Sequence, residues 1–347
     1  MKKVSVIILN WNGSGMLRRF LPSVLRYSSV PDGEVCVADN GSTDDSCRVV
    51  ETEFPTVRLL RLNQNHGFAE GYNRAISAVE AEYVVLLNSD VEVTEGWLSP
   101  LVTWMDGHPE VAACQPKLLS ERDRDCFEYA GAAGGFIDRY GYPFCRGRVF
   151  ETVERDNGQY DTVVPVFWAS GAALLIRRKV YEDVGGLDGA FFAHMEEIDL
   201  CWRLRSRGHG IVCVPSSQVY HVGGATLKKE SPRKTYLNFR NNLLMLYKNL
   251  SPRELAPVMR VRRVLDVVAA VVFLLKGEVE NAKAVLQARR DFCRMRDAYT
   301  EVRQDNWRKT VVVDIPERCP FSLVWQVKVR GKRTFNEIVQ SVNKYES

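Results

Sequence analysis

Apolar runs of strand length alternate with segments of helical spacing along the first 115 residues. Residues 4–9 form a largely β-branched apolar run interrupted only by Ser5, which is typical of a strand buried on both faces of a parallel sheet. Residues 14–27 follow with apolar positions at helical intervals. This βαβα order predicts a mostly parallel central sheet with helices on both faces. The alternation predicts further strands at 34–38, 57–62, 83–87 and 111–115, and helices that end near residues 53, 79 and 107.

Polar segments follow the first four expected strands. They lie at positions 10–12, 39–41, 63–65 and 88–90, and two of these segments contain an aspartate. Ligands of such sheets bind beyond the carboxyl ends of the strands. The pattern therefore predicts a nucleotide-binding crevice along this edge of the sheet.

The second part of the chain is less regular. Residues 120–162 are rich in glycine, arginine and aromatic residues, and we interpret them as an excursion over the site. In the first part of the chain, the helix that ends near residue 53 is expected to be capped by Ser42 or Thr43. Later expected elements are paired strands at 163–168 and 172–176, a helix at 196–207, and strands at 210–214 and 218–220. Beyond His221 the pattern predicts helices at 231–249, 252–275 and 278–299.

Composition and charge divide the chain further. The 347 residues are 46% hydrophobic and 26% charged, as in ordinary globular domains, which excludes a collagen-like, disordered or disulfide-stapled protein. Residues 1–225 contain 22 Lys or Arg and 30 Asp or Glu, whereas residues 226–347 contain 25 and 13. The nine cysteines include no CxxC pair, so free thiols in a reducing compartment, the cytoplasm, are expected.

The basic region 226–347 leaves two interpretations open. No apolar run reaches the roughly 18–20 residues of a membrane span, and the longest candidate, residues 264–275, is interrupted by Asp266. Arginines precede this run, so it could lie on an anionic membrane as a peripheral element. It could instead form a helical cap packed on the rest of the chain. No nucleic-acid-binding motif accompanies the charge, so a nucleic acid is not an expected partner.

Two aspartates and a histidine are candidates for ligand binding. Asp90 follows a buried strand and could hold Mg²⁺ or Mn²⁺ against phosphates, or could cap the next segment. Asp39 could bind a base or ribose, or could stabilise the turn that follows it. His221 precedes a glycine pair and could complete a metal site or be structural.

Three carboxylates, Glu196, Glu197 and Asp199, open the helix expected at 196–207. They could match the positive end of the helix dipole, or apolar neighbours could raise the pKa of one of them toward that of a useful general base. The glycine-bearing loop at 65–73 has neither GxGxxG nor GxxxxGK[ST] spacing, which disfavours a dehydrogenase or a P-loop kinase.

These segments, taken in order, resemble a known family. The motifs are VIILNWNG at 6–13, VADNGSTD at 37–44, NHGFAEGYN at 65–73, LLNSD at 86–90, SGA at 170–172, EEIDLCWR at 196–203 and HVGG at 221–224. They are similar to the motifs of family-two glycosyltransferases with the glycosyltransferase A fold, most of all to the rhamnosyltransferase-like branch.

The resemblance implies a nucleotide site and a metal site. Asp39 would recognise the nucleoside, and Asp90 matches the last residue of the family's DxD-type metal motif, in which Asn88 here replaces the first aspartate. Mg²⁺ or Mn²⁺ would then be held by Asp90, His221 and the diphosphate. Residues that would shape the nucleotide pocket are Asn10, Asn12, Asn65, Gly71, Asn73 and Ser89.

The resemblance also implies a catalytic base and an acceptor side. The family's base is the second residue of a Glu-Asp pair, and Glu197 occupies that position here, while Glu196 or Asp199 could substitute for it. The acceptor side would be lined by Trp168, Ser170 and Gly171. The implied organisation is a catalytic domain at 1–225, with a nucleotide-binding half at about 1–115 and an acceptor-binding half at about 116–225, followed by a basic, mainly helical extension at 226–347.

The expected function is inverting, metal-dependent glycosyl transfer. The donor would be a nucleotide-diphosphate sugar of the dTDP-rhamnose or UDP-hexose type, and the acceptor a hydroxyl of a saccharide or lipid-linked molecule in cell-surface polysaccharide synthesis. The reaction would occur in the cytoplasm, with peripheral contact to the inner face of the membrane as an open possibility. Two alternatives are a non-catalytic sugar-nucleotide or polysaccharide-binding module and a nucleotidyltransferase, and the second lacks its glycine- and arginine-rich phosphate loop at 10–13.

Overall fold

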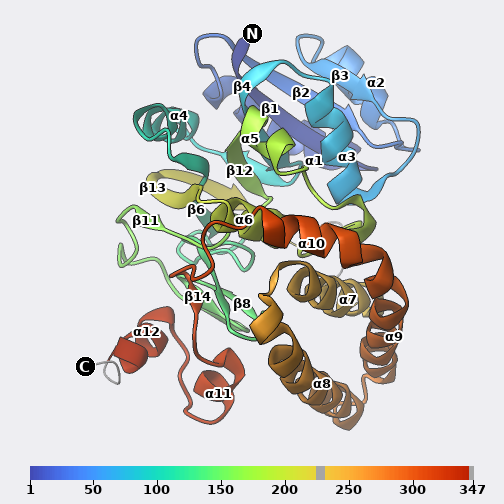
Figure 1. The fold of residues 1–347 in the computed structure, drawn as a ribbon. Coiled ribbons are helices and arrows are strands. Elements are labelled where there is room, and N and C mark those ends of the chain that lie inside the picture. Colours follow the sequence, from blue (N-terminus) through green and yellow to red (C-terminus); the bar gives the residue numbers. More distant parts are fainter. Residues whose placement is uncertain (224–230, 344–347) are drawn as a thin grey trace.

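A large mixed sheet forms the centre of the protein (Figure 1). The computed structural model describes residues 1–223 and 231–343, so the expected boundary between 225 and 226, like Gly224 of the last motif, lies outside the described residues. Along the sheet the strands run in the order β11-β13-β6-β12-β4-β1-β2-β3, with β5 paired to β13. Their bounds are β1 (Lys2–Asn10), β2 (Gly33–Asp39), β3 (Arg58–Arg61), β4 (Ala81–Asn88), β5 (Val91–Val93), β6 (Val111–Ser120), β11 (Val164–Pro165), β12 (Ala173–Arg177) and β13 (Gly210–His221).

The sheet is mostly parallel and is buried on both faces. Strands β1, β2, β3 and β4 pair in parallel, as do β6 and β13, whereas β12 runs antiparallel to β4 and β6. Along β1, Ile7 packs into one apolar cluster while Val6 and Ile8 pack into the other, as the two-residue repeat of a strand requires. The predicted α/β fold with helices on both faces is therefore confirmed.

Helices cover both faces of the sheet. The first cluster receives α3 and α6, and the second receives α1, α2 and α4, while α5 follows β12 directly. Their bounds are α1 (Ser14–Tyr27), α2 (Ser46–Glu53), α3 (Gly67–Ser77), α4 (Leu98–Gly107), α5 (Arg178–Asp183) and α6 (Glu196–Ser206).

Three local predictions were wrong. Strands β11 and β12 do not pair with each other in the described chain, because β11 pairs with β13 while β12 lies between β4 and β6. The two strands expected at 210–214 and 218–220 are one strand, β13, whose register shifts between Val214 and Gln218. Helix α2 begins at Ser46 after Asp45, later than a cap at Ser42 or Thr43 would place it.

A second, smaller sheet connects the middle of the chain to its C-terminal segment. Its strands run β10-β9-β8-β7-β14, and β14 (Arg318–Cys319) pairs in parallel with β7 (Gly135–Asp138). The Asp138 carboxylate also accepts a hydrogen bond from the backbone N–H of Leu323, 2.8 Å away. The other strands are β8 (Pro143–Cys145), β9 (Arg148–Val149) and β10 (Thr152–Val153), and the last helices are α10 (Thr300–Arg308), α11 (Leu323–Lys328) and α12 (Phe335–Asn343).

Three long helices follow β13 and the last sequence motif: α7 (Pro232–Asn249), α8 (Pro252–Leu275) and α9 (Val279–Met295). They match the helices expected beyond His221, and both α7 and α8 start with a serine cap followed by proline. Screening the described helices for a stretch that is both long and apolar enough to traverse a bilayer identifies none.

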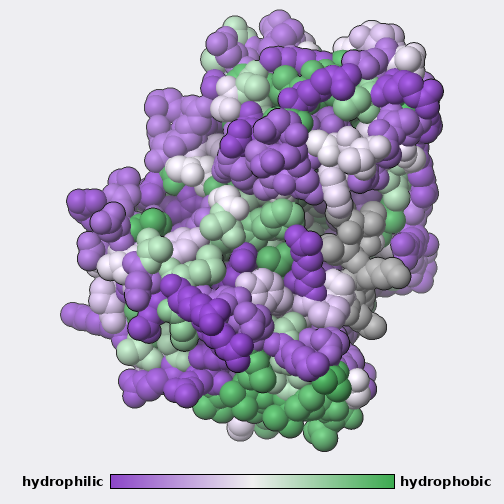
Figure 2. All heavy atoms as spheres, turned by 90° about the vertical axis from the view of Figure 1, so that its right-hand side faces the viewer, coloured by the Kyte–Doolittle hydropathy of each residue, from purple (hydrophilic) through white to green (hydrophobic). Residues whose placement is uncertain are grey.

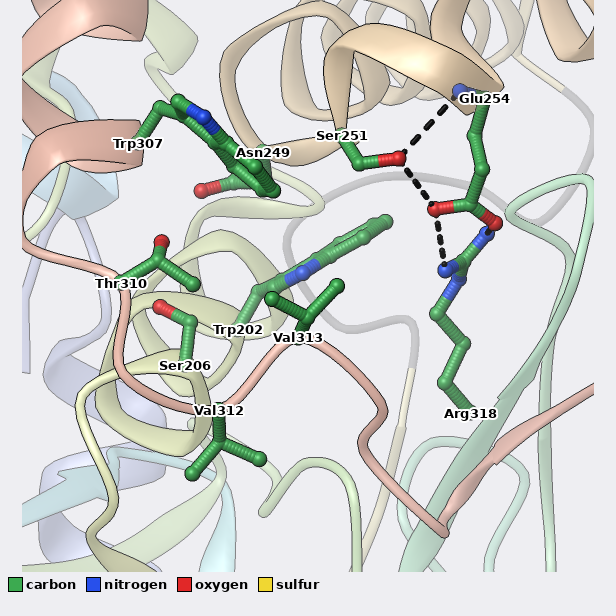
Figure 3. A pocket seen from close by; sticks show the side chains of 10 residues that line it. All are labelled: Trp202, Ser206, Asn249, Ser251, Glu254, Trp307, Thr310, Val312, Val313 and Arg318. Atoms are coloured by element: carbon green, nitrogen blue, oxygen red, sulfur yellow. Dashed lines mark hydrogen bonds and ion pairs between the residues drawn. The ribbon is translucent and has the colours of Figure 1, made fainter.

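A small cavity lies where α6 meets the C-terminal segment (Figure 3). The indoles of Trp202 and Trp307 lie on it, and Arg318 forms an ion pair with Glu254 at its rim. Its volume is about 10 Å³, which is about enough for one water molecule. The cavity is therefore a packing gap behind α6 and is too small for a sugar.

Candidate active site

The carboxyl ends of the central strands meet at one edge of the sheet. Asn10 of β1 lies opposite Asp39 of β2, and Leu9 lies opposite Asn88 of β4. The Asn88 N–H donates to the carbonyl of Ala172, just before β12, at 3.0 Å. Strand register therefore brings the segments at 10–12, 39–41 and 88–90 to the same edge, as the sequence predicts, and the bond from Asn88 brings the motif at 170–172 next to them.

Asn10 and Asp39 form the floor of the predicted nucleoside site. Both are buried, and Asn10 Nδ2 lies 3.3 Å from Asp39 Oδ1. The other Asp39 oxygen accepts from the Ser42 N–H at 3.0 Å. Asn10 Oδ1 is buried and has no hydrogen-bond partner among the described residues, and a Cβ at Gly13 would lie 2.4 Å from it. Glycine at position 13 thus leaves an acceptor oxygen open toward Ser89.

The other residues expected to bind the nucleotide lie in the loops near Asn10 and Asp39 or on α3. Asn12 has a φ of 51°, and its Oδ1 accepts from the Thr43 N–H at 2.7 Å. Asn65 Oδ1 accepts from the Gly67 N–H at 2.8 Å, at the start of α3. Gly71 lies against Leu9 and Asn40, where a Cβ would come within 3.1 Å of the Asn40 amide nitrogen. Asn73 bonds both backbone groups of Leu187, so its side chain ties α3 to the segment before α6.

Asp90 and His221, the two residues expected to bind a metal, lie next to each other. His221 Nε2 lies 3.1 Å from Asp90 Oδ1 and 3.4 Å from Asn88 Nδ2. Burial opposes a charge on His221, but Glu128 and Asp90 outweigh it and raise the pKa of His221 to about 10. Burial likewise opposes ionisation of Asp90, but the hydrogen bond with His221 holds its pKa below the usual value.

Glu128 is a site residue that the sequence did not reveal. Its carboxylate lies 3.5 Å from His221 Nδ1, on the opposite side of the ring from Asp90. A carboxylate on the far nitrogen orients a metal-ligating imidazole. Glu128 lies in the irregular segment 120–162, where no strand or helix period marks it.

The donor set fits a hard divalent cation only in part. The carboxylate oxygen of Asp90 suits Mn²⁺ or Mg²⁺. His221 Nε2 lies 3.1 Å from it and could join as a ligand only after losing its proton. Residues 1–223 and 231–343 contain no group of three or more His, Cys, Asp or Glu side chains placed to hold a metal ion. A cation at this pair would therefore take further ligands from the donor diphosphate.

The start of α6 carries two glutamate carboxyl groups, each with a buried oxygen. Glu196 Oε2 and Glu197 Oε2 are buried, and neither has a hydrogen-bond partner in the described parts of the chain. Burial raises the pKa of Glu197 to about 7, and burial together with Glu197 raises the pKa of Glu196 well above its usual value. The Cβ of Glu197 lies 3.8 Å from the position that a Cβ on Gly171 would take. Glu197 is thus the glutamate placed next to the 170–172 motif.

The Asp199 carboxylate is occupied by hydrogen bonds and ion pairs within the protein. Its carboxylate accepts from Lys248 Nζ at 2.8 Å, Asn249 Nδ2 at 2.8 Å and Arg203 Nε at 3.1 Å. Burial opposes its charge, but Lys248 and Arg203 hold the pKa of Asp199 below the usual value. A carboxylate with three charged or polar donors is a poor base.

The three predicted acceptor residues are buried. Trp168 Nε1 donates to the Phe136 carbonyl at 2.9 Å, and Ser170 Oγ donates to the Ala130 carbonyl at 2.7 Å. A Cβ on Gly171 would lie 3.1 Å from the ring of Phe68. Of the three, Gly171 is the one next to Glu197, while Trp168 and Ser170 support the surrounding backbone.

A strained turn precedes the two glutamates. Phe192, His194 and Met195 have φ values of 65°, 70° and 70°, which side-chain-bearing residues adopt at a cost of about 1–3 kcal/mol each. Asn241 of α7 holds this turn, because its Nδ2 lies within 2.9 Å of the carbonyl oxygens of Phe191, Ala193 and His194. The helix beyond the motifs therefore positions the start of α6.

Replacing Asn241 by alanine is expected to lower kcat by up to roughly 10²-fold while donor affinity stays unchanged. The reason is that a small misplacement of a reacting group costs this much in rate, and Asn241 contacts the turn but not the nucleotide edge. Steady-state kinetics with direct donor-binding measurements would separate the two effects. Asn281→Ala, a buried asparagine of α9 bonded to Thr235, is the matched control. Equal kcat in the two variants would rule out the positioning role.

Comparisons with known proteins show the family of the chain. The Glycosyl transferase family 2 model matches residues 5–185. A Mycobacterium tuberculosis protein named N-acetylglucosaminyl-diphospho-decaprenol L-rhamnosyltransferase is 31% identical over 234 residues, which are 62% of this chain and 75% of that protein.

Two solved structures share the fold at low identity. S. aureus TarS 1–349 aligns with a TM-score of 0.55 and 16% identity over 88% of this chain and 89% of that one. The mannosyltransferase PcManGT from Pyrobaculum calidifontis, in complex with GDP-Man and Mn²⁺, aligns with a TM-score of 0.50 and 15% identity over 88% and 84%. With the family match over more than half of its length, the chain belongs to glycosyltransferase family 2: it is a glycosyltransferase of the glycosyltransferase A fold, similar to the family's rhamnosyltransferases.

Proposed function

We propose that the chain transfers a sugar from a nucleotide-diphosphate donor to an acceptor hydroxyl with inversion at C1, and that it requires a divalent cation. The observation that carries this proposal is the buried Oε2 of Glu197, which has no hydrogen-bond partner among the described residues, on a side chain whose Cβ lies next to Gly171. A carboxylate with a raised pKa and no partner is suited to accept a proton.

The reaction follows from these positions. The acceptor oxygen forms a bond to C1 of the donor sugar on the face opposite the diphosphate, and the bond from C1 to the diphosphate oxygen breaks with its electron pair on the diphosphate. Glu197 takes the hydroxyl proton, and Asp39 with Asn10 holds the nucleoside end. Asp90 and His221 would hold Mg²⁺ or Mn²⁺, which would supply positive charge to the departing diphosphate.

The proposed donor is of the dTDP-rhamnose or UDP-hexose type, and the acceptor is a saccharide or a lipid-linked molecule. The Mycobacterium tuberculosis relative, whose name gives L-rhamnose transfer to a diphospho-decaprenol, supports this class. The GDP-Man and Mn²⁺ bound by PcManGT support the metal for the shared fold. Residues 1–115 would bind the donor, 116–225 the acceptor, and 226–347 would extend the domain. The unpaired state of all nine cysteines supports a cytoplasmic reaction.

A donor screen is the direct test. The purified chain is mixed with UDP-, dTDP- and GDP-sugars in the presence of Mn²⁺, and release of the nucleoside diphosphate is measured. We expect one nucleotide class to be turned over, because hydrogen bonds to Asp39 and Asn12 hold the loop at 42–44 in one arrangement. Binding of a donor without turnover, with or without acceptor extract, would favour the non-catalytic binding module instead.

A further inference from the structure

The outer face of α8 is apolar. Val264 is 62% exposed and Leu275 is 84% exposed. Other large hydrophobic side chains exposed on this helix are Val261, Val267, Val268, Val271, Val272 and Leu274. Figure 2 shows hydrophobic side chains gathered at the lower end of the molecule, where α8 lies in Figure 1. We name these residues the α8 apolar surface. A contiguous exposed patch of this kind marks an interaction site.

Buried charges lock the orientation of α8. Arg262 is 2% exposed, and its guanidinium bonds Asp266 at 3.0 Å and the carbonyl of Tyr140 at 2.8 Å. Asp266 is also paired with Arg289 of α9. Rolling the helix to bury its valines would strip these charges of their partners, which is strongly unfavourable. The apolar surface therefore faces outward, because the buried ion pairs fix the opposite face of α8 against the protein.

Cations border the α8 apolar surface. Arg260 and Arg263 are exposed at one end and Lys276 at the other. The acidic residues of the helix face elsewhere, because Asp266 is buried and Glu254 pairs with Arg318. An apolar strip between cationic side chains is the pattern of a helix that lies in the headgroup region of an anionic bilayer.

We propose that the α8 apolar surface inserts into the headgroup and upper acyl region of an anionic lipid membrane. Pairing with a second copy of the chain fits less well: an antiparallel pair would bring Arg260 near Lys276, and a parallel pair would bring Arg263 near Arg263. The inference rests on the proposed function in one respect, since a lipid-linked acceptor would explain why such contact is useful.

Side-chain contacts would connect the membrane-bound helix α8 to the turn that precedes Glu196. Arg262 on the inner face of α8 bonds the side chain of Asn242 in α7. The next residue of α7 toward the N-terminus is Asn241, which holds the turn before Glu196. Insertion of α8 would therefore fix the orientation of the catalytic edge relative to the bilayer.

Vesicle sedimentation tests the proposal with the full chain. Val264, Val268 and Val271 lie on one stripe at helical spacing, and the triple variant V264E, V268E, V271E puts three carboxylates there. On vesicles of phosphatidylglycerol and phosphatidylcholine in equal parts, we expect the bound fraction to fall at least about tenfold relative to the wild type. The exposed Val311, outside α8, supplies the matched control V311E, which should bind like the wild type.

The same experiment separates the other outcomes. Loss of wild-type binding on vesicles of phosphatidylcholine alone, and in high salt, would agree with the cationic border. Equal sedimentation of the triple variant and the wild type would overturn the proposal. So would a concentration-dependent dimer that the triple variant dissociates while no vesicle is bound. Donor turnover is measured in parallel, so that a failure of the proposed reaction is distinguished from a failure of membrane contact.

Discussion

Turnover of the Glu197→Gln variant is expected to fall by roughly 10²–10⁴-fold, the contribution of a positioned general base, with nucleotide binding retained. The amide keeps the size of the side chain but cannot take a proton from the acceptor hydroxyl. Glu197 Oε2 has no competing partner among the described residues, so the full basicity of the group is available to the acceptor. Stopped assays of sugar transfer and calorimetric titration with the nucleoside diphosphate would measure the two effects separately.

The pH dependence of wild-type activity is a second test of Glu197 as the general base. Burial raises the pKa of Glu197 to about 7, and only the deprotonated form can act as base. Activity should therefore be low below pH 7, rise through that region and level off above it. Glu182→Gln, an exposed glutamate of α5, should retain the wild-type profile. A variant Glu196→Gln that loses turnover while Glu197→Gln retains it would transfer the role to the neighbouring residue.

The Asp90→Asn variant is expected to lose metal-dependent activity, by at least about 10²-fold, because a cation contributes several kcal/mol of charge stabilisation to a departing diphosphate. Asparagine preserves the shape of the side chain and removes the charge that His221 and the cation both require. Activity as a function of Mn²⁺ concentration would show whether the loss is one of metal affinity. Asp106→Asn, at the Lys3 pair near the opposite end of the sheet, is the control. Full wild-type activity in the presence of a strong chelator would contradict the metal model.

The central fold could be predicted because its strands are buried on both faces. A run such as residues 4–9, apolar except for Ser5, is typical of a strand between two layers of helices, and that signal is local. The pairing of β11 could not be predicted in the same way. Its two residues, Val164 and Pro165, form a short edge strand, and the partner is chosen by the tertiary position of β13.

Site residues could be predicted where a motif ends a strand. Residues that reach the site from distant parts of the sequence could not be predicted. Asp39 and Asp90 follow buried runs, so their edge is given by topology. Glu128 reaches His221 from an irregular segment, and Asn241 reaches the turn before α6 across about 50 residues of chain. Neither partner has a local sequence signal, because the geometry that makes it useful exists only in the folded protein.

The pairing of β14 with β7 has a consequence for synthesis on the ribosome. Residues 318 and 319 complete a sheet begun near residue 135, so the last tenth of the chain closes a structure whose first strands were made much earlier. Contacts of such separation form late and slowly. Until the C-terminal segment leaves the exit tunnel, the edge of β7 stays open and the Asp138 carboxylate lacks its Leu323 donor. The nascent chain would thus carry an unpaired strand edge at β7, a natural binding target for a chaperone.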